Sequence, residues 1–453
     1  MTTMRALQAV SAATLPMRIL VAAHSHPEVS NGGGEIAAFE LFRALRDRGD
    51  CEAWFLGCDR GAEADRPGAA LSQPFSDREY LYVAGQFDWF KFANRDPCFP
   101  AEIDRLFGEL APDIVHFHHY INFGVEVFQH LKRVAPRCRI VLTLHEYLAI
   151  CHHFGQMVTK PHRGLCHQSS PARCQKCFPE FARSDFFLRR AYIQRFFDLV
   201  DGFVAPSQFL ADRYIAWGVP EAKMTVLENV TAAVAPTATA ARRSPGEPLR
   251  LGFFGQISGL KGIDVVFDAA EMLAAQEVLD VSFEIHGDYR GQPPEFQANF
   301  LARLAKAGGN VHFHGAYDRE RVDRLMRSVH AVLVPSVWWE NSPVVIQEAL
   351  RNACPIICSD IGGMAEKVRD GIDGFHFSVG SAMALAALAR RLAAEPEALG
   401  RLAKDMRTRA ASLAASDAGL DSHMALYRRQ LAGRETSGAA VWSGAATDKV
   451  EPA

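Results

Sequence analysis

The chain has 453 residues, 49% of them apolar, so it is long enough to bury the cores of two or three domains. Its 49 Lys and Arg residues nearly balance its 52 Asp and Glu residues, and this formal charge of −3 argues against a nucleic-acid-binding protein. No apolar run reaches the roughly 18 to 20 residues of a membrane-spanning helix. These bounds favour a multidomain globular protein.

The N-terminal residues and the cysteines bear on the compartment. Residues 1–16 lack the apolar core of a secretory signal and run directly into a strand-like segment, so we expect a disordered leader before Met17, or a true start at that methionine. Ten cysteines without a secretory signal indicate the reducing cytoplasm.

Short apolar runs rich in Val, Ile and Phe alternate with longer amphipathic stretches along most of the chain. This alternation is typical of parallel sheets built from strand–helix–strand units. In the first half, the expected helices include Glu35 to Asp47 and Phe209 to Trp217. The expected strands there are Arg18 to Ala23, Glu52 to Leu56, Asp113 to Phe117, Arg139 to Leu144, Gly202 to Pro206 and Met224 to Leu227.

The alternation stops at residues 233–248, where Ala, Thr and Pro replace the periodic apolar residues, and this segment is predicted to be a linker. It separates a domain over residues 17–232 from a second alternating domain over residues 249–415. A last helix over residues 416–431 would follow and cross back to the first domain, and residues 432–453 are expected to form a disordered tail. Two doubly wound sheets in tandem place a cleft between the carboxyl ends of their strands.

The strongest motif follows the apolar strand AVLVPS and reads Glu340-Asn-Ser-Pro-Val-Val-Ile-Gln-Glu348. Ser342 is a natural N-cap and Pro343 a natural first helical residue, so amides near Val344 would meet a diphosphate at the positive end of a helix. Glu340 would lie beside this end and Glu348 more than one turn inside the helix. The pair suits a ligand with hydroxyl groups on both sides of its phosphates; the alternative is two solvated glutamates at an ordinary helix start.

The spacing of Glu340 and Glu348 is the E-x7-E of the large retaining glycosyltransferase family with the GT-B fold, often called family 4 or glycosyl transferases group 1. The chain resembles this family along most of its length. The matching pieces are Asn31-Gly-Gly-Gly-Glu35, His145 after RIVLTL, Ser207 in FVAPSQF, FFGQISGLKG, PSVWWENSP and Ser359-Asp-Ile-Gly-Gly363. The resemblance implies two facing Rossmann-like, doubly wound α/β domains with an interdomain cleft. The N-terminal domain would hold the acceptor, the C-terminal domain would hold a nucleoside-diphosphate sugar, and catalysis would require no cofactor.

The resemblance also implies roles for single residues of the C-terminal half. Glu340 would lie near the hydroxyls of the donor sugar, Glu348 would bind the ribose, and Ser342 to Val344 would surround the phosphates. Lys261 would neutralise the diphosphate, whose negative charge grows as the glycosidic bond breaks. Gln256 stands where the family commonly has an Arg, so the enzyme would depend more on Lys261 and the helix end, or on another cation.

In the N-terminal half, the glycines at residues 32–34 let backbone amides approach a ligand closely, although they do not form the dinucleotide-binding pattern G-x-G-x-x-G. The resemblance places Gly33 and Gly34 against the donor phosphates or the acceptor, and places His145 near the anomeric centre as a hydrogen-bonding group. A flexible turn and a packed strand-end histidine are the alternatives. The histidines within residues 116–119 are given no role.

Four cysteines lie within 27 residues: Cys151, Cys166, Cys174 and Cys177. Four thiols with a terminal C-x2-C match the ligand set of structural Zn²⁺, and the segment between them is too polar and irregular to form a core of its own. We therefore expect a Cys-rich insertion over residues 151–177 that a structural zinc can hold. Free buried thiols or a redox pair are the alternatives.

The segment from Phe181 to Phe197 mixes aromatic side chains with four arginines, at residues 183, 189, 190 and 195. Such a helix can lie on an anionic membrane surface, which would fit a lipid-linked acceptor and a position at the inner face of the membrane. Aromatic residues at helical spacing also pack in cores, so a buried helix is the alternative.

The sequence thus predicts a retaining glycosyltransferase that moves a sugar from a nucleoside-diphosphate sugar to a glycan, lipid-linked or small-molecule acceptor, in the synthesis of a cell-surface polysaccharide or glycoconjugate. The expected catalytic residues are His145, Glu340 and Lys261. Because no carboxylate is placed as a nucleophile, a same-face displacement assisted by the departing phosphate is the expected route. The alternatives are a sugar-nucleotide epimerase of the same fold, which needs no acceptor, and a non-catalytic sugar-nucleotide-binding scaffold.

Overall fold

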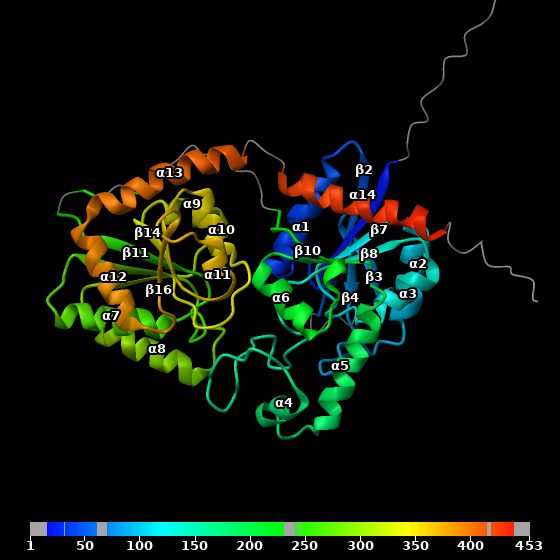
Figure 1. Ribbon diagram of the computed structural model, residues 1–453, viewed down its shortest axis with the longest axis horizontal. Coiled ribbons are helices and arrows are strands. Elements are labelled where there is room, and N and C mark those ends of the chain that lie inside the picture. The colour runs from blue at the N-terminus through cyan, green and yellow to red at the C-terminus, as the bar shows by residue number, and fades with distance from the viewer. Residues whose placement is uncertain are drawn as a thin grey trace, which may run out of the picture.

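The computed structural model describes residues 16–30, 32–60, 70–230, 241, 243–244, 246–414 and 418–438. These residues form two α/β domains that lie side by side (Figure 1), as the alternating pattern predicts. Residues 1–15 of the expected leader and residues 233–240, 242 and 245 of the expected linker fall outside the described residues, as does the expected tail beyond residue 438.

The N-terminal sheet has the strand order β10-β9-β8-β7-β1-β2-β4-β3, and only the β3–β4 pair is antiparallel. Its strands are β1 (Met17–Ala22), β2 (Cys51–Asp59), β3 (Leu71–Ser76), β4 (Glu79–Val83), β7 (Ile114–Phe117), β8 (Arg139–Thr143), β9 (Gly202–Ala205) and β10 (Met224–Val226). Two short strands, β5 (Phe87–Asp88) and β6 (Ala93–Asn94), pair separately. The helices are α1 (Gly33–Arg46), α2 (Phe99–Leu110), α3 (Val127–Val134), α4 (Pro171–Cys177), α5 (Arg183–Phe197) and α6 (Gln208–Trp217).

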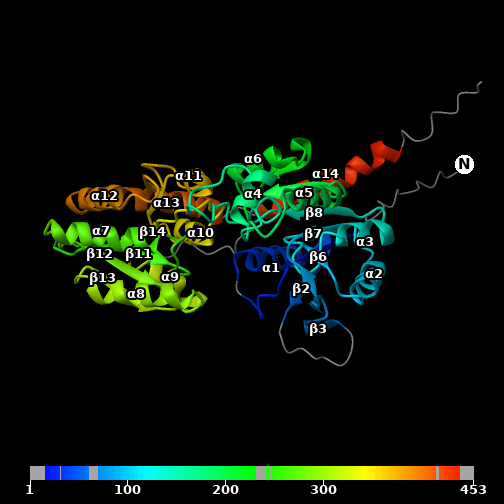
Figure 2. The same cartoon turned by 90° about the horizontal axis from the view of Figure 1, so that it is seen from below.

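The central strand β1 shows why this sheet is covered by helices on both faces (Figure 2). Leu20 packs in the core on one face and Ile19 in the core on the other, and both side chains are fully buried. Parallel strands with two buried faces read as continuous apolar runs, which is the pattern MRILVA. On one of these faces, α1 buries Ala38 and Leu41 at helical spacing against the strand.

The C-terminal sheet is entirely parallel, in the order β13-β12-β11-β14-β15-β16. Its strands are β11 (Leu249–Phe254), β12 (Val281–His286), β13 (Val311–Gly315), β14 (Ala331–Val334), β15 (Ile356–Ser359) and β16 (Gly374–Phe377). The helices are α7 (Ile263–Ala275), α8 (Pro294–Lys306), α9 (Val322–Met326), α10 (Val344–Arg351), α11 (Gly362–Lys367), α12 (Ala382–Ala394) and α13 (Pro396–Ala414). No described helix is both long and apolar enough to cross a bilayer.

Each sheet reverses its strand order once, and these reversals fix where loops can form a binding site. In the N-terminal sheet the chain builds outward from β1 toward β2 on one side and from β7 toward β10 on the other. In the C-terminal sheet the reversal lies between β11 and β14. The loops that leave the carboxyl ends of such neighbouring strands diverge and leave a crevice, which is where open parallel sheets bind ligands.

The last helix, α14 (Ala418–Gly438), crosses back over the N-terminal sheet (Figure 1). Leu420, Met424 and Tyr427 enter the core that contains Ile19. The last described helix therefore packs on the domain that contains β1, and it joins the two domains a second time.

The C-terminal boundary of this helix differs from the prediction. Residues 432–438 were expected in a disordered tail, but they continue α14 to Gly438. The stretch LAGRETSG has no apolar periodicity, yet Leu, Ala, Arg and Glu are good helix formers and an established helix extends at low cost.

The hydrogen bond between α14 and the sheet provides a test of this packing. The hydroxyl of Tyr427 lies 2.6 Å from Nδ1 of the buried His116, whose Nε2 lies 2.7 Å from the Thr143 hydroxyl. We expect Tyr427→Phe to lower the free energy of unfolding by about 1–3 kcal/mol, because it leaves a buried ring nitrogen unpaired. Urea denaturation measures this change. Tyr80→Phe is the matched control, since the Tyr80 hydroxyl bonds to no described residue, and equal effects of both changes would contradict the assignment.

Candidate active site

The C-terminal wall of the cleft is organised around the buried carboxylate of Glu340, in the loop after β14. Its Oε1 accepts hydrogen bonds from Nζ of Lys261, from Oγ of Ser336 at 2.9 Å and from Nε1 of Trp338 at 3.0 Å. Lys261 comes from the loop after β11, the strand on the other side of the reversal point. The structure thus brings together the two residues that the sequence analysis placed on the donor sugar and the diphosphate.

Two glycines allow the loops of this wall to pack closely. Gly262 has a φ of +77°, and a Cβ on it would lie 1.9 Å from the carbonyl oxygen of Pro335. A Cβ on Gly363 would lie 1.6 Å from the carbonyl oxygen of Asn341. No larger residue fits at either position without moving the backbone. Gly262 therefore lets the lysine loop pack closely against the loop after β14, and Gly363 lets the start of α11 do the same.

The helix α10 begins one residue later than predicted, so the prediction of Ser342 as N-cap is wrong. Pro343 occupies the N-cap position, with a φ of −59° and a ψ of 127°, and Val344 is the first helical residue. The Ser342 hydroxyl instead donates to Glu228 at 2.8 Å and accepts from Nε2 of Gln347 at 2.9 Å. Glu228 belongs to the end of the N-terminal domain, so a contact distant in sequence replaces the local cap.

The other two predicted donor residues lie on the same wall. Glu348 is half-buried on α10 and lines the pocket between α10 and α1. Burial raises the pKa of Tyr317, and the charge of Glu348 adds to this shift. Gln256 is exposed in the loop after β11, and its side chain bonds to no described residue. The first amides of α10 have no carbonyl partner within the helix, as at any helix start.

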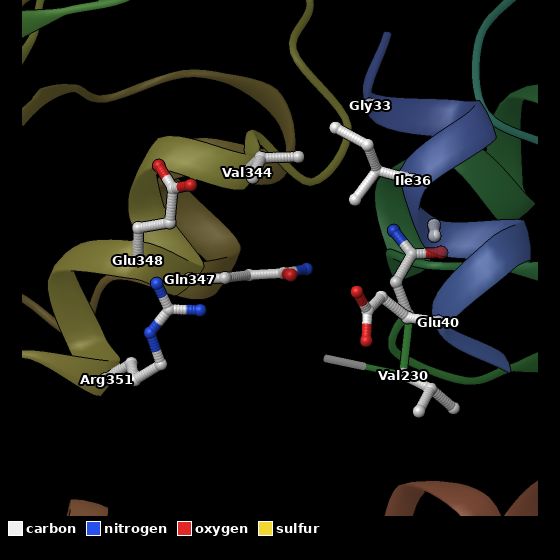
Figure 3. A pocket seen from close by; sticks show the side chains of 10 residues that line it. Gly33, Ile36, Glu40, Val230, Val344, Gln347, Glu348 and Arg351 are labelled. Atoms are coloured by element: carbon white, nitrogen blue, oxygen red, sulfur yellow. The ribbon is translucent and has the colours of Figure 1, made fainter. Parts of the chain in front are cut away.

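The N-terminal wall meets this one directly. A Cβ on Gly33, the first residue of α1, would lie 3.2 Å from a methyl group of Val344. The side-chain amide of Asn341 donates to the carbonyl oxygen of His145 at 2.6 Å. Figure 3 shows the pocket between the two helices, with Val344 and Gln347 of α10 reaching toward α1 and the Glu348 side chain lying farther back along α10.

His145 follows β8 and belongs to the N-terminal wall of the cleft. Its Nε2 is 3.0 Å from Nδ1 of His118, and a Cβ on Gly34 would lie 3.6 Å from the rings of both His145 and His24. Burial lowers the pKa of His145 to about 3, so its imidazole is uncharged at neutral pH. An uncharged imidazole suits hydrogen bonding to a sugar hydroxyl, and a backbone link to Asn341 couples its position to the donor wall.

The structure places further titratable side chains beside His145 that the sequence analysis left without a role. They are His24 after β1, Glu35 on α1, His118 and His119 after β7, and Glu146 after β8. One signal in the sequence points to these residues: several of them directly follow apolar strands. The carboxyl ends of parallel strands share one edge of the sheet, so such residues gather there.

The four cysteines of the insertion line one cavity of about 440 Å³. Burial raises the pKa of Cys151 to about 11, and the charges of Cys166 and Cys174 add to this shift, so these thiols lie near one another. Among the described residues, however, no three His, Cys, Asp or Glu side chains are grouped closely enough to hold a metal ion.

Two family models match the chain in succession. Residues 31–231 match Glycosyltransferase Family 4, and residues 236–411 match Glycosyl transferases group 1. Together they span both walls of the cleft.

Curated relatives match shorter stretches. The D-inositol 3-phosphate glycosyltransferase of Nocardia farcinica is 33% identical over 135 residues, which cover 29% of each chain. The lipopolysaccharide 1,2-N-acetylglucosaminetransferase of Salmonella typhimurium is 26% identical over 190 residues, 39% of this chain and 48% of the relative. The matches thus span less than half the length of either relative.

Solved structures match the chain over nearly its full length. Anabaena Alr3699/HepE in complex with UDP-glucose has a TM-score of 0.59 at 18% identity and covers 93% of this chain and 100% of its own. The sucrose-phosphate synthase of Thermosynechococcus elongatus has a TM-score of 0.66 at 17% identity, covering 92% and 100%. The chain therefore belongs to the glycosyltransferases of the GT-B fold, with a family 4 domain in its N-terminal half and a group 1 domain in its C-terminal half.

Proposed function

We propose that the chain transfers a glycosyl group, with retention of configuration, from a nucleoside-diphosphate sugar to a glycan, lipid-linked or small-molecule acceptor. The observation that carries this proposal is the pairing of Lys261 with Glu340 beside the start of α10, opposite His145. A diphosphate at this helix end would meet free amides, the positive end of the helix and the lysine. The sugar would then extend toward Glu340 and His145.

The roles of the donor residues follow from this placement. Lys261 stabilises the charge that develops on the leaving diphosphate, and Glu340 holds hydroxyls of the transferred sugar while keeping the lysine in place. Glu348 binds the ribose, and Gly33, Gly34 and the residues around Ser342 enclose the phosphates.

We propose a same-face displacement in place of a covalent intermediate. Oε1 of Glu340 is occupied by three donors, which fits a role in holding Lys261 and the sugar hydroxyls. In the same-face route, the acceptor oxygen bonds to the anomeric carbon as the bond to the diphosphate breaks, and the hydroxyl proton passes to a diphosphate oxygen. Configuration is retained because both bonds lie on one face of the sugar.

The acceptor belongs to a cell-surface polysaccharide or glycoconjugate in this proposal, and a lipid-linked acceptor would bring the protein to the inner face of the membrane. Relatives named for lipopolysaccharide and amylovoran synthesis support this role. Residues 152–197 carry eight Lys and Arg against two Asp and Glu, on a chain whose overall charge is −3. Phe154, Phe187 and Leu188 are 74%, 63% and 55% exposed in this segment. Basic residues around exposed apolar side chains suit an anionic lipid surface.

We also propose that the four cysteines of the insertion bind one structural zinc. The four cysteines line one cavity, which supports this assignment. Burial and then the neighbouring thiols raise the pKa values of Cys151 and Cys174, so the thiolate forms are disfavoured, and a bound Zn²⁺ would favour them. Cys151 and Cys166 lie in an irregular loop, whereas Cys174 and Cys177 lie on the short helix α4, so a metal would fix the loop to this helix.

Substitutions in the donor site should separate three roles. Lys261→Ala should mainly slow turnover, because the cation acts most strongly in the transition state. Glu348→Ala should weaken binding of the free nucleoside diphosphate, whereas Glu340→Ala should impair turnover and leave that binding nearly unchanged. Each loss should be about tenfold or more. Exposed residues of α8 supply the controls Glu295→Ala and Lys306→Ala.

Calorimetric titration of the nucleoside diphosphate, together with initial rates, measures these effects. A thermal-shift screen of nucleotide sugars first identifies the donor. If Glu340→Ala loses affinity and Glu348→Ala does not, the two roles are wrongly assigned. Conversion of the donor to its epimer without an acceptor would instead identify an epimerase.

The membrane contact is tested by sedimentation with vesicles. The protein should bind phosphatidylglycerol vesicles, and Phe187→Ser with Leu188→Ser should reduce this binding about tenfold or more, since two apolar side chains no longer insert. Leu279→Ser with Met383→Ser removes equally exposed apolar side chains from the other domain and should leave binding unchanged. Equal binding to phosphatidylcholine vesicles, or equal losses in both double variants, would contradict the proposed surface.

The zinc site is tested by elemental analysis of protein expressed in the cytoplasm. We expect about one zinc per chain, and a lower metal content and melting temperature in Cys174→Ser with Cys177→Ser. Cys98→Ser, which changes an exposed cysteine outside the insertion, should alter neither quantity. Absence of stoichiometric metal in the parent protein would show that the four cysteines are free thiols.

A further inference from the structure

Four side chains form an acid–imidazole row beside His145: Glu35, His24, His119 and Glu146. Nε2 of His24 lies 3.2 Å from the Glu35 carboxylate, and Nε2 of His119 lies 3.1 Å from the Glu146 carboxyl. The two imidazoles contact each other edge to face, with centroids 4.7 Å apart. The row therefore runs from the start of α1, past the ends of β1 and β7, to the end of β8.

Backbone hydrogen bonds determine which ring nitrogen of His119 carries the proton. Its Nδ1 accepts hydrogen bonds from the amides of Tyr120 and Ile121, both at 3.0 Å. The ring proton must then sit on Nε2, which donates to Glu146. The amide of Leu148 donates to the other oxygen of the Glu146 carboxyl. Glu146 is thus oriented from both sides, yet about a quarter of its side chain stays exposed to solvent.

The row lies on the acceptor side of the proposed reaction centre. A Cβ on Gly34 would be 3.6 Å from both His24 and His145, so the row begins next to the histidine that faces the donor wall. The hydroxyl of Tyr147, the residue after Glu146, is buried and bonds to no described residue. Buried polar groups usually have a partner, so a polar ligand beside the row would satisfy this hydroxyl.

The charges of the row indicate what kind of ligand it accepts. Burial lowers the pKa of His119 and of His145, so both rings are neutral. The pKa of Glu35 is lowered by its bond to His24 despite burial, whereas burial raises the pKa of Glu146 to about 8. Arg189, whose charge acts on Glu146, donates to three main-chain carbonyl oxygens. A phosphate here would lose water without gaining a cation, whereas hydroxyl groups can both donate and accept.

We propose that Glu146 is an acceptor-binding residue and that, with Glu35 and His24, it binds hydroxyl groups of an uncharged sugar ring as the acceptor. The inference rests on the proposed transfer reaction and adds the class of acceptor to it. Glu146 binds hydroxyls that neighbour the attacking one. The attacking oxygen bonds to the anomeric carbon, the bond to the diphosphate breaks, and the hydroxyl proton goes to the diphosphate.

The charge distribution around the cleft agrees with this assignment. The basic segment over residues 152–197 begins six residues after Glu146, so an acceptor can place an uncharged sugar on the row and direct an anionic part toward that segment. Gly155 packs against Glu146, since a Cβ on this glycine would lie 2.6 Å from the Glu146 carboxyl. The insertion therefore closes one side of the row.

The test uses the full-length protein with the donor found in the thermal-shift screen. Octyl glucoside, octyl galactoside and octyl mannoside are offered as acceptors beside the same glycosides phosphorylated at O6, and products are detected by mass spectrometry. We expect products from uncharged acceptors. Glu146→Ala should raise their KM about tenfold, whereas Glu146→Gln, which can still donate and accept, should retain most of the affinity. Glu180→Ala, which removes an exposed carboxylate just beyond the insertion, is the matched control.

Two further readouts separate the possible outcomes. Affinity for the nucleoside diphosphate and the melting temperature should be unchanged in both Glu146 variants, which shows that the donor side and the fold are intact. Preferential use of phosphorylated acceptors, transfer to water alone, or an unchanged acceptor KM in Glu146→Ala would each overturn the inference. Absence of donor binding and of any donor turnover in the parent would instead count against the proposed transfer reaction.

Discussion

The site depends on the direction of the strands in two sheets. Parallel strands deliver the loops after them to one edge, and a reversal of strand order opens a crevice at that edge. Here the loops at these edges of the two sheets meet, as the hydrogen bond from Asn341, after β14, to the carbonyl oxygen of His145, after β8, shows. Residues far apart in sequence, such as His24, His145, Lys261 and Glu340, therefore converge without any helix or strand having to bend toward them.

This arrangement places a buried carboxylate at the centre of the donor wall. Glu340 is tolerated there because a lysine, a serine and a tryptophan donate to one of its oxygens. The same bonds hold the lysine in position before any diphosphate arrives, so little reorganisation accompanies the growth of charge on the leaving group. The close packing at Gly262 and Gly363 keeps both loops in this arrangement.

The sequence predicted the parts of this structure that local patterns determine. The six strands expected in the N-terminal half match observed strands to within a few residues, and the helix after Glu340 begins one residue from its predicted start. The antiparallel pair β3–β4 was missed because both strands are short and most side chains of β3 are not buried. The N-cap role of Ser342 failed because Glu228 approaches it from the other domain. The contacts of Glu146 could not be read from its neighbours in sequence, since its partner His119 comes from another strand end.

In the proposed complex a nucleotide sugar binds between the start of α10 and the start of α1. Amide hydrogen exchange of the full chain, with and without a donor that binds it, tests this placement. We expect slower exchange in both residues 32–38 and residues 344–348 when the donor is bound. Slower exchange in only one of these segments, or in neither, would contradict a donor site shared by the two domains.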